Sequence, residues 1–182
     1  MVQMQIEKHL YLTGYRGTGK SAVGVILARR LERPVIDLDQ VIEANAGKSI
    51  REIFDDGGES LFRQLEREAL ATVSESDPAV ISLGGGTILK EQNRQLIDRK
   101  GVCFWLRAEP ETIAKRINAD QTTSESRPPL TEMDQLSEIR EMLVRRHDLY
   151  ASSADFQIDA EGKTVECVAD EILELLGNVP DS

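Results

Sequence analysis

The stretch GYRGTGKS, at residues 14–21, combines a glycine-rich turn with a lysine and a hydroxyl. It matches the pattern G-x-x-x-x-G-K-[ST], in which Gly14, Gly19, Lys20 and Ser21 occupy the fixed positions. The backbone N–H groups of such a turn wrap a phosphate, and the positive end of the following helix points at it. The lysine reaches the β- and γ-phosphates, and the hydroxyl is a ligand for Mg²⁺. A strand-like run precedes the turn and an amphipathic segment follows it, so the sequence predicts a nucleoside triphosphate site rather than an ordinary glycine turn at a helix start.

Two carboxylates follow this pattern closely, because the run PVIDLD at 34–39 contains Asp37 and Asp39. Their i, i+2 spacing points both side chains to one face for as long as the strand lasts. One carboxylate can hold Mg²⁺ through water, and the other can orient or deprotonate an attacking hydroxyl. The alternative for Asp39 is structural, since aspartate also caps helices well and a helix is expected to begin near Gln40.

Three consecutive glycines, Gly84, Gly85 and Gly86, end the third apolar run of the chain. Glycines at the end of a strand let the backbone approach a ligand where a Cβ atom would collide. A plain loop is the alternative interpretation, and a triple glycine at this place favours the ligand site.

Helical geometry singles out Arg146. In the helix expected from about Asp134 to Tyr150, Arg146 falls about 50° from the centre of the apolar stripe, at roughly 100° per residue. A buried guanidinium without an anionic partner is costly, so Arg146 is expected to meet a protein carboxylate or a ligand, unless it snorkels at the edge of the stripe. Arg63 lies about 130° from the apolar centre of its own helix and can simply pair with Glu59 one turn earlier.

Composition narrows the choice of ligand. The 182 residues include 22 Lys and Arg against 32 Asp and Glu, a formal net charge of -10. Such a field repels polyanions, so we expect no nucleic-acid partner. No apolar run approaches the roughly 18 residues that span a bilayer, and the amino terminus does not resemble a signal peptide. We expect a cytoplasmic monomer that does not bind membranes, in which Cys103 and Cys167 are buried small hydrophobes.

The candidate site residues must be positioned by the elements of the fold. Five short apolar runs alternate with helix-patterned segments along the chain. The runs span residues 9–14, 34–39, 79–86, 101–106 and 154–159. Continuous apolar strands separated by helices indicate a parallel sheet covered by helices on both faces. Ligands bind such sheets at the carboxyl ends of the strands, where four of the runs carry glycines or aspartates. The sequence therefore predicts a single three-layer α/β/α domain over 1–182 with a five-stranded parallel sheet.

Three segments stand apart within this domain. Residues 41–76 are expected to form a helical substrate-binding segment, and 178–182 a flexible tail. Residues 118–133 form the one long polar stretch in the interior of the chain, and a loop of this length is usually functional or disordered. Arg127 directly precedes two prolines there. The prolines restrict the backbone, which suits a lid that must deliver an arginine repeatedly to one place.

Taken in order, these motifs resemble the shikimate kinase family, small P-loop kinases of aromatic amino-acid biosynthesis. The resemblance covers about residues 9–177 and rests on GYRGTGKS, DLDQVIE, the pair Phe62 and Arg63, SLGGG, the pair Arg127 and Pro128, and R-x-x-x-Y from Arg146 to Tyr150. The P-loop alone would indicate only a superfamily, whereas the whole set is far more specific. The resemblance implies a P-loop kinase fold, ATP and Mg²⁺ as cofactors, and phosphorylation of the 3-hydroxyl of shikimate.

The resemblance also implies a role for individual residues. Asp39 would bind the shikimate hydroxyls and be the candidate base, while Asp37 would hold Mg²⁺ with Ser21. The catalytic residues would be Lys20, Asp39 and Arg127. The ATP-binding residues would be Gly14, Gly17, Thr18, Gly19, Lys20, Ser21, Ala22, Arg116, Arg127 and Lys163. The shikimate-binding residues would be Asp39, Arg63, Gly84, Gly85, Gly86 and Arg146.

Other functions are compatible with the same phosphate site. A kinase for another small polyol or acid, such as gluconate, is one, although two arginines directed at one carboxylate favour shikimate. A regulator that binds nucleotide without phosphorylating a metabolite is another, and it would show ATP binding without shikimate-dependent turnover. A nucleoside monophosphate kinase is disfavoured, because the chain has no separate motif for the second nucleotide.

Overall fold

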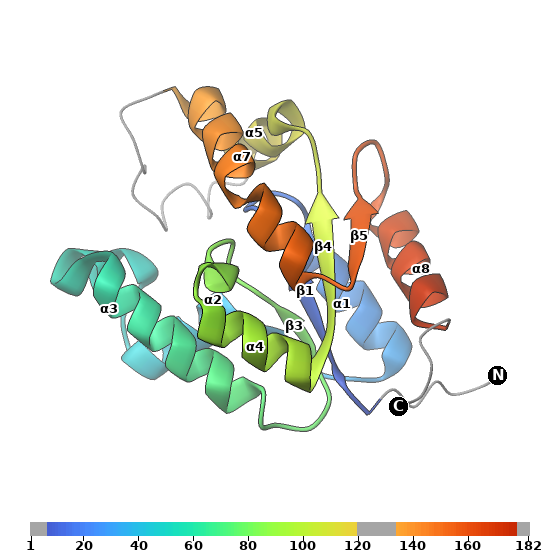
Figure 1. Ribbon diagram of the computed structural model, residues 1–182, viewed down its shortest axis with the longest axis horizontal. Helices are drawn as coiled ribbons and strands as arrows, with labels where there is room; N and C mark the ends of the chain where they lie inside the picture. Colours follow the sequence, from blue (N-terminus) through green and yellow to red (C-terminus); the bar gives the residue numbers. More distant parts are fainter. Residues whose placement is uncertain (1–6, 120–133, 178–182) are drawn as a thin grey trace.

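The computed structural model describes residues 7–119 and 134–177, which form three layers (Figure 1). Five strands make one parallel sheet in the order β2-β3-β1-β4-β5. The strands are β1 (His9–Thr13), β2 (Val35–Asp37), β3 (Val80–Ser82), β4 (Gly101–Arg107) and β5 (Phe156–Asp159). Each strand coincides with one of the five apolar runs, so the predicted five-stranded parallel sheet is confirmed.

Helices cover both faces of this sheet and part of its carboxyl edge. They are α1 (Lys20–Leu31), α2 (Leu38–Ala46), α3 (Ile50–Val73), the 3₁₀ helix η1 (Thr87–Leu89), α4 (Glu91–Lys100), α5 (Pro110–Ala119), α7 (Gln135–Ser153) and α8 (Val165–Leu176). The apolar side chains of α1 and α8 pack on one face, and those of α2, α3, α4 and the end of α7 on the other. Helix α5 and the start of α7 lie beyond the arrowheads of β4 and β5 (Figure 1).

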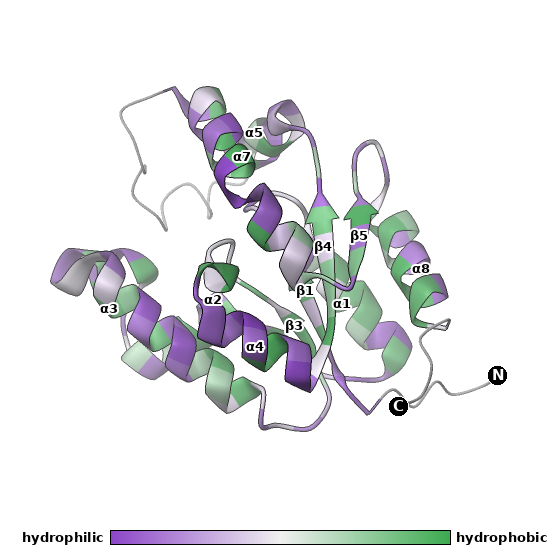
Figure 2. Ribbon diagram, in the orientation of Figure 1, coloured by the Kyte–Doolittle hydropathy of each residue, from purple (hydrophilic) through white to green (hydrophobic). Residues whose placement is uncertain are grey.

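The central strands explain why the apolar runs are continuous. In β1, Tyr11 joins the core beneath α3 and α4, whereas Leu10 and Leu12 join the core beneath α1 and α8. Successive side chains of a strand point to opposite faces, so a strand covered on both faces is apolar at every position. The helices are apolar on one side only, which Figure 2 shows as hydrophobic and hydrophilic residues alternating along them.

Strand register brings the chemically interesting ends together. Leu12 pairs with Ser82, and Ser82 pairs in turn with Asp37 on the other side of β3. The phosphate-binding turn after β1, the aspartates of β2 and α2, and the glycines after β3 therefore meet at one edge of the sheet.

One boundary differs from the prediction. Strand β2 ends at Asp37, and Asp39 already lies in the first turn of α2. The side chain of Asp37 accepts a hydrogen bond from the backbone N–H of Asp39 at 3.1 Å, so Asp37 rather than Asp39 caps the helix. The expectation that both carboxylates project from one strand is wrong, because the chain turns into the helix one residue after Asp37.

Two smaller expectations have different outcomes. Cys103 is buried as predicted, but Cys167 is exposed, because it lies on the outer side of α8. Helix α7 spans the predicted region, with Asp134 as its cap. Over the part of the chain that the structure describes, no helix is both long and apolar enough to cross a bilayer.

Candidate active site

A cavity of about 650 Å³ opens at this carboxyl edge of the sheet. Its wall is formed by the phosphate-binding turn, the β2–α2 junction, the turn after β3 and helix α5. The residues predicted from the sequence that line it are Gly17, Gly19, Lys20, Ser21, Ala22, Asp37, Asp39, Gly84, Gly85 and Arg116. The cavity thus joins the predicted ATP and shikimate sites in one space.

The phosphate-binding turn has the geometry of an anion site. Gly19 has a φ of 97°, a conformation that favours glycine, and it directly precedes α1. Among the described residues no side chain caps this helix, so its first N–H groups are available to a ligand. Lys20 is buried and donates to the carbonyls of Gly14 and Tyr15, both at 2.9 Å. Thr18 Oγ1 donates to the Tyr15 carbonyl as well, at 2.8 Å.

Three oxygen-bearing side chains lie beside the turn. Ser21 Oγ donates to Asp37 Oδ2 at 2.7 Å and lies 3.4 Å from Ser82 Oγ. Hydroxyl and carboxylate oxygens suit Mg²⁺, which usually takes one or two protein ligands together with phosphates and water. In the described ranges no group of three or more His, Cys, Asp or Glu residues could hold a metal by itself. This set therefore suits a nucleotide-bound Mg²⁺ rather than a permanent metal.

The opposite end of the cavity is built around Gly84. A Cβ atom on Gly84 would lie 3.0 Å from Asp39 Oδ1 and 3.1 Å from Glu66 Oε1, so two carboxylates flank this glycine. Glu66 is fully buried and accepts hydrogen bonds from Thr87 Oγ1 at 2.8 Å and Arg63 Nη1 at 2.7 Å. Asp39 is the carboxylate of the two that lines the cavity.

Arg63 is held more firmly than its helical position suggested. Its side chain is only 13% exposed, and it pairs with Glu59 at 3.2 Å, as predicted, and with Glu66 at 2.7 Å. A Cβ atom on Gly86 would lie 2.7 Å from its Nη1 atom, so the guanidinium packs directly against the glycine turn. The angle from the apolar stripe did not predict this burial, because this turn covers that side of α3. Sequence reasoning missed Glu66, although its i, i+3 spacing from Arg63 was a usable signal.

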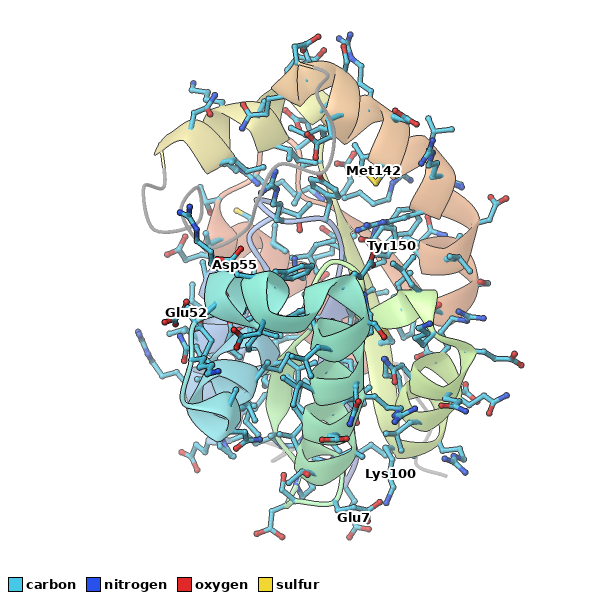
Figure 3. The ribbon with its side chains drawn as sticks, turned by 90° about the vertical axis from the view of Figure 1, so that its left-hand side faces the viewer. Glu7, Glu52, Asp55, Lys100, Met142 and Tyr150 are labelled. Carbon is cyan, nitrogen blue, oxygen red and sulfur yellow. The ribbon has the colours of Figure 1, made fainter. Side chains whose placement is uncertain are left out.

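Arg146 points inward, as the helical angle predicted. Its Nη1 donates to the carbonyl of Gly85 at 3.1 Å, and the side chain is half-buried. Its neighbour Arg145 is exposed and pairs with Glu141. Tyr150, one turn further along α7, donates to the same Gly85 carbonyl at 2.5 Å; Figure 3 labels it. Within residues 7–119 and 134–177, the hydrogen-bond partner of Arg146 is thus a neutral carbonyl rather than a carboxylate.

Arg63 and Arg146 contact the glycine turn but are not among the residues that line the cavity, and the remaining cations differ in their relation to it. Arg116 of α5 lines it and makes long contacts with the carbonyls of Gly17 at 3.4 Å and Thr18 at 3.5 Å. Lys163 is not among the lining residues and pairs with Glu171 at 2.6 Å, a contact that raises its pKa. Arg127 lies outside the described residues.

Comparison with known proteins points to one family. A family model for shikimate kinase matches residues 16–177. The shikimate kinase of Rhodopirellula baltica is 46% identical over 167 residues, which cover 92% of this chain and 89% of that protein. The structure of shikimate kinase from Acinetobacter baumannii in complex with shikimate superposes with a TM-score of 0.89 at 29% identity, over 97% of both chains. A gluconokinase from Sinorhizobium meliloti, with a TM-score of 0.57 at 15% identity, shares the fold alone.

Proposed function

The chain belongs to the shikimate kinase family, and we infer that it transfers the γ-phosphoryl group of ATP to the 3-hydroxyl of shikimate. The products are shikimate 3-phosphate and ADP, in the pathway to chorismate and the aromatic amino acids. The observation that carries this function is that the phosphate-binding turn and Asp39 line one cavity, beside the glycine turn that Arg63 and Arg146 contact.

Arg63 and Arg146 are proposed to bind the carboxylate of shikimate. They reach the same glycine turn from different helices, since Arg146 donates to Gly85 and Arg63 packs on Gly86. Two guanidinium groups beside one turn suit a carboxylate, because each can donate paired N–H groups to its oxygens. Asp39, at the cavity side of Gly84, would accept the proton of the 3-hydroxyl or orient that hydroxyl for attack.

Lys20 is proposed to stabilise the charge that develops on the transferred phosphoryl group. It now donates to two neutral carbonyls, and a phosphate oxygen is the stronger acceptor because it is charged. In phosphoryl transfer the protein acts mainly by positioning and electrostatic stabilisation. Arg127 is proposed to add a second cation there, and Gly14, Gly17, Thr18, Gly19 and Ala22 to bind the phosphates through the turn and the start of α1.

Ser21 and Asp37 are proposed to hold Mg²⁺ with the nucleotide. Their oxygens would hold the ion, whose positive charge would neutralise part of the charge on the phosphates. Asp37 accepts from Ser21 and caps α2 at the same time, which keeps both oxygens beside the turn.

The other features of the site are also proposals. Arg116 would contact ATP from α5, whereas Lys163 remains a prediction without a place in the cavity wall. Residues 41–76 would carry part of the shikimate site and 118–133 the lid. We propose that the protein acts as a cytoplasmic monomer.

The test is the release of ADP by the purified protein with Mg·ATP, with and without shikimate, beside gluconate. We expect ADP release to depend on shikimate and not on gluconate. ATP binding without turnover of either compound would contradict the proposed function and favour a nucleotide-binding regulator. Turnover of gluconate alone would contradict the assignment of the acceptor.

A further inference from the structure

Glu161, in the loop between β5 and α8, joins this loop to the start of α5. Its Oε2 accepts from the backbone N–H of Glu109 at 2.9 Å, and its Oε1 accepts from Thr112 Oγ1 at 2.7 Å. Its own N–H donates to Asp159 Oδ1 at 3.0 Å, which holds the loop at the end of β5. One carboxylate therefore ties two segments that are about fifty residues apart in sequence, and both of its oxygens are used.

Glu161 holds the start of α5 together with Arg140 of α7, which pairs with Glu111 in the first turn of the helix. The first N–H groups of a helix have no partners within the helix, and Glu109 is the residue directly before α5. A carboxylate at this position also interacts favourably with the helix dipole. The hydrogen bond from Glu109 and then that from Thr112 lower the pKa of Glu161, so the carboxylate is ionised at neutral pH.

Helix α5 rests in turn on the phosphate-binding turn. A Cβ atom on Gly17 would lie 3.2 Å from the carbonyl of Ile113, so the helix approaches the turn as closely as a glycine allows. Arg116 contacts the carbonyls of Gly17 and Thr18, and both Arg116 and Ile117 line the cavity. The position of α5 therefore sets one wall of the cavity.

The order of the strands shows which part of the ligand this wall meets. The phosphate-binding turn follows β1, and the acceptor residues Asp39 and Gly84 follow β2 and β3 on one side of it. A nucleotide whose γ-phosphate faces the acceptor must extend its nucleoside toward the other side, where β4 and β5 lie. The segments after these strands are α5 and the loop of Glu161.

We propose that Glu161 is a positioning residue for the nucleotide, which seats α5 against the phosphate-binding turn through Glu109 and Thr112 and so fixes the nucleoside side of the cavity. Glu161 acts through α5 and does not itself touch the nucleotide. The proposal rests on the proposed function only in that the cavity binds ATP and ADP.

Two substitutions at Glu161 separate the effect of its hydrogen bonds from the effect of its charge. ADP affinity is measured by calorimetry on the full chain. Glu161→Ala removes both hydrogen bonds, and we expect ADP binding to weaken about tenfold. Glu161→Gln removes the charge, but its amide oxygen can accept from Glu109 and its NH₂ can donate to Thr112 Oγ1. We therefore expect Glu161→Gln to bind ADP within about twofold of the unaltered protein.

Two further variants are matched to these. Glu166→Ala removes an exposed carboxylate from α8 and is expected to leave ADP affinity unchanged. Thr112→Val removes only one of the two bonds, so it should weaken ADP binding less than Glu161→Ala does. It also keeps the test available if the alanine variant does not fold. In steady-state assays Glu161→Ala should raise the KM for ATP and leave the KM for shikimate unchanged.

Two results would overturn the proposal. Loss of a negative charge on the nucleotide side of the molecule also favours anion binding, so equal tightening of ADP binding in the alanine and glutamine variants would show that only charge matters. A lower melting temperature with unchanged ADP affinity in both Glu161→Ala and Thr112→Val would show that Glu161 only stabilises the start of α5. If the unaltered protein binds ADP but does not phosphorylate shikimate, the proposed function fails, whereas the affinities still decide the role of Glu161.

Discussion

The two ends of the cavity hold their cations in different ways. At the phosphate end, Lys20 donates to the neutral carbonyls of Gly14 and Tyr15. At the acceptor end, Arg63 forms ion pairs, one of them with the fully buried Glu66. A neutral carbonyl leaves the charge of its cation uncompensated, whereas breaking a buried ion pair costs about 3–5 kcal/mol. The phosphate end is therefore arranged to exchange partners when ATP arrives, whereas the acceptor end is fixed in advance.

Arg146 stands between these two cases. It belongs to the acceptor end, yet its partner is the neutral Gly85 carbonyl, which Tyr150 also contacts. The acceptor end thus combines one arginine that is fixed by carboxylates with one that can turn toward a ligand. This difference can be tested one cation at a time.

The largest effect is expected at the phosphate end. Lys20→Met removes the cation proposed to exchange carbonyls for phosphate, and an arginine finger, which stabilises the same developing charge, is worth about 10³–10⁵ in rate in P-loop enzymes. We expect kcat to fall within that range in steady-state assays, with the fold retained. Lys100→Met is the matched control, because Lys100 pairs with Glu75 and does not line the cavity. An equal loss in both variants would show that Lys20 does not act on the phosphates.

Removal of the fixed cation should cost stability as well as binding. Arg63→Ala leaves the buried Glu66 carboxylate without its guanidinium partner, and breaking such a pair costs about 3 kcal/mol. We expect this loss in urea unfolding. The double variant Arg63→Ala with Glu66→Gln should recover part of it, because the remaining amide is neutral. Unchanged stability of Arg63→Ala would contradict the idea of a preformed acceptor end.

The exchangeable arginine should affect binding alone. Arg146→Ala removes the charged donor proposed for the shikimate carboxylate, so we expect the KM for shikimate to rise by about 10- to 100-fold. Stability should change little, since no buried carboxylate is left behind. Arg145→Ala, on the exposed side of α7, is the control. A drop in stability as large as that of Arg63→Ala would remove the distinction between the two arginines.

The smallest effect is expected far from both ends. His9 is buried, its Nδ1 accepts from the N–H of Ala79 at 3.1 Å and its Nε2 lies 3.3 Å from the Ser74 carbonyl, so it is neutral and protonated on Nε2. Burial is the main cause that lowers its pKa below 6.5. As the pH falls below 6.5, the unfolded chain takes up the proton first, so stability decreases until the pH falls below the pKa of the folded state.

Urea unfolding between pH 7.5 and 5 measures this loss, which is at most about 1.4 kcal/mol per pH unit for one proton. In His9→Gln the dependence on pH should be weaker. Glu7 lies close to His9 in sequence, and the charge of Lys100 acts on the His9 ring. Both residues lie at the opposite end of the molecule from Met142 of α7 (Figure 3). The ratio of the KM for ATP to the KM for shikimate should therefore be the same in His9→Gln as in the unaltered protein. A change in that ratio would mean that the two ends of the cavity depend on the base of the sheet.

Patterns that depend on near neighbours in sequence were sufficient for much of this molecule. The five strands follow from continuous apolar runs, because burial on both faces leaves no polar positions. Lys20 follows from a fixed motif, and the inward direction of Arg146 from the 100° step of a helix. In each of these cases the physical cause lies within one element.

The missed features depend on contacts between elements. The periodicity of α3 does not predict the burial of Arg63, because it contains no information about the glycine turn that covers this side chain. Glu66 was overlooked because a charged residue is expected outside unless a partner from elsewhere compensates it. The bonds of Glu161 join β5–α8 to α5, which no local pattern connects. The cap of α2 is Asp37, two residues before the expected Asp39, so even the boundary of a helix can differ by two residues from its prediction.

The most direct test of the two-ended cavity is a comparison of both KM values in Arg146→Ala and Arg116→Ala. Each variant removes one guanidinium that donates to neutral carbonyls, one from each end. The two-ended site predicts that Arg146→Ala raises the KM for shikimate with the KM for ATP unchanged, and that Arg116→Ala does the reverse. If both variants raise both KM values by the same factor, the cavity does not divide into a nucleotide end and a shikimate end.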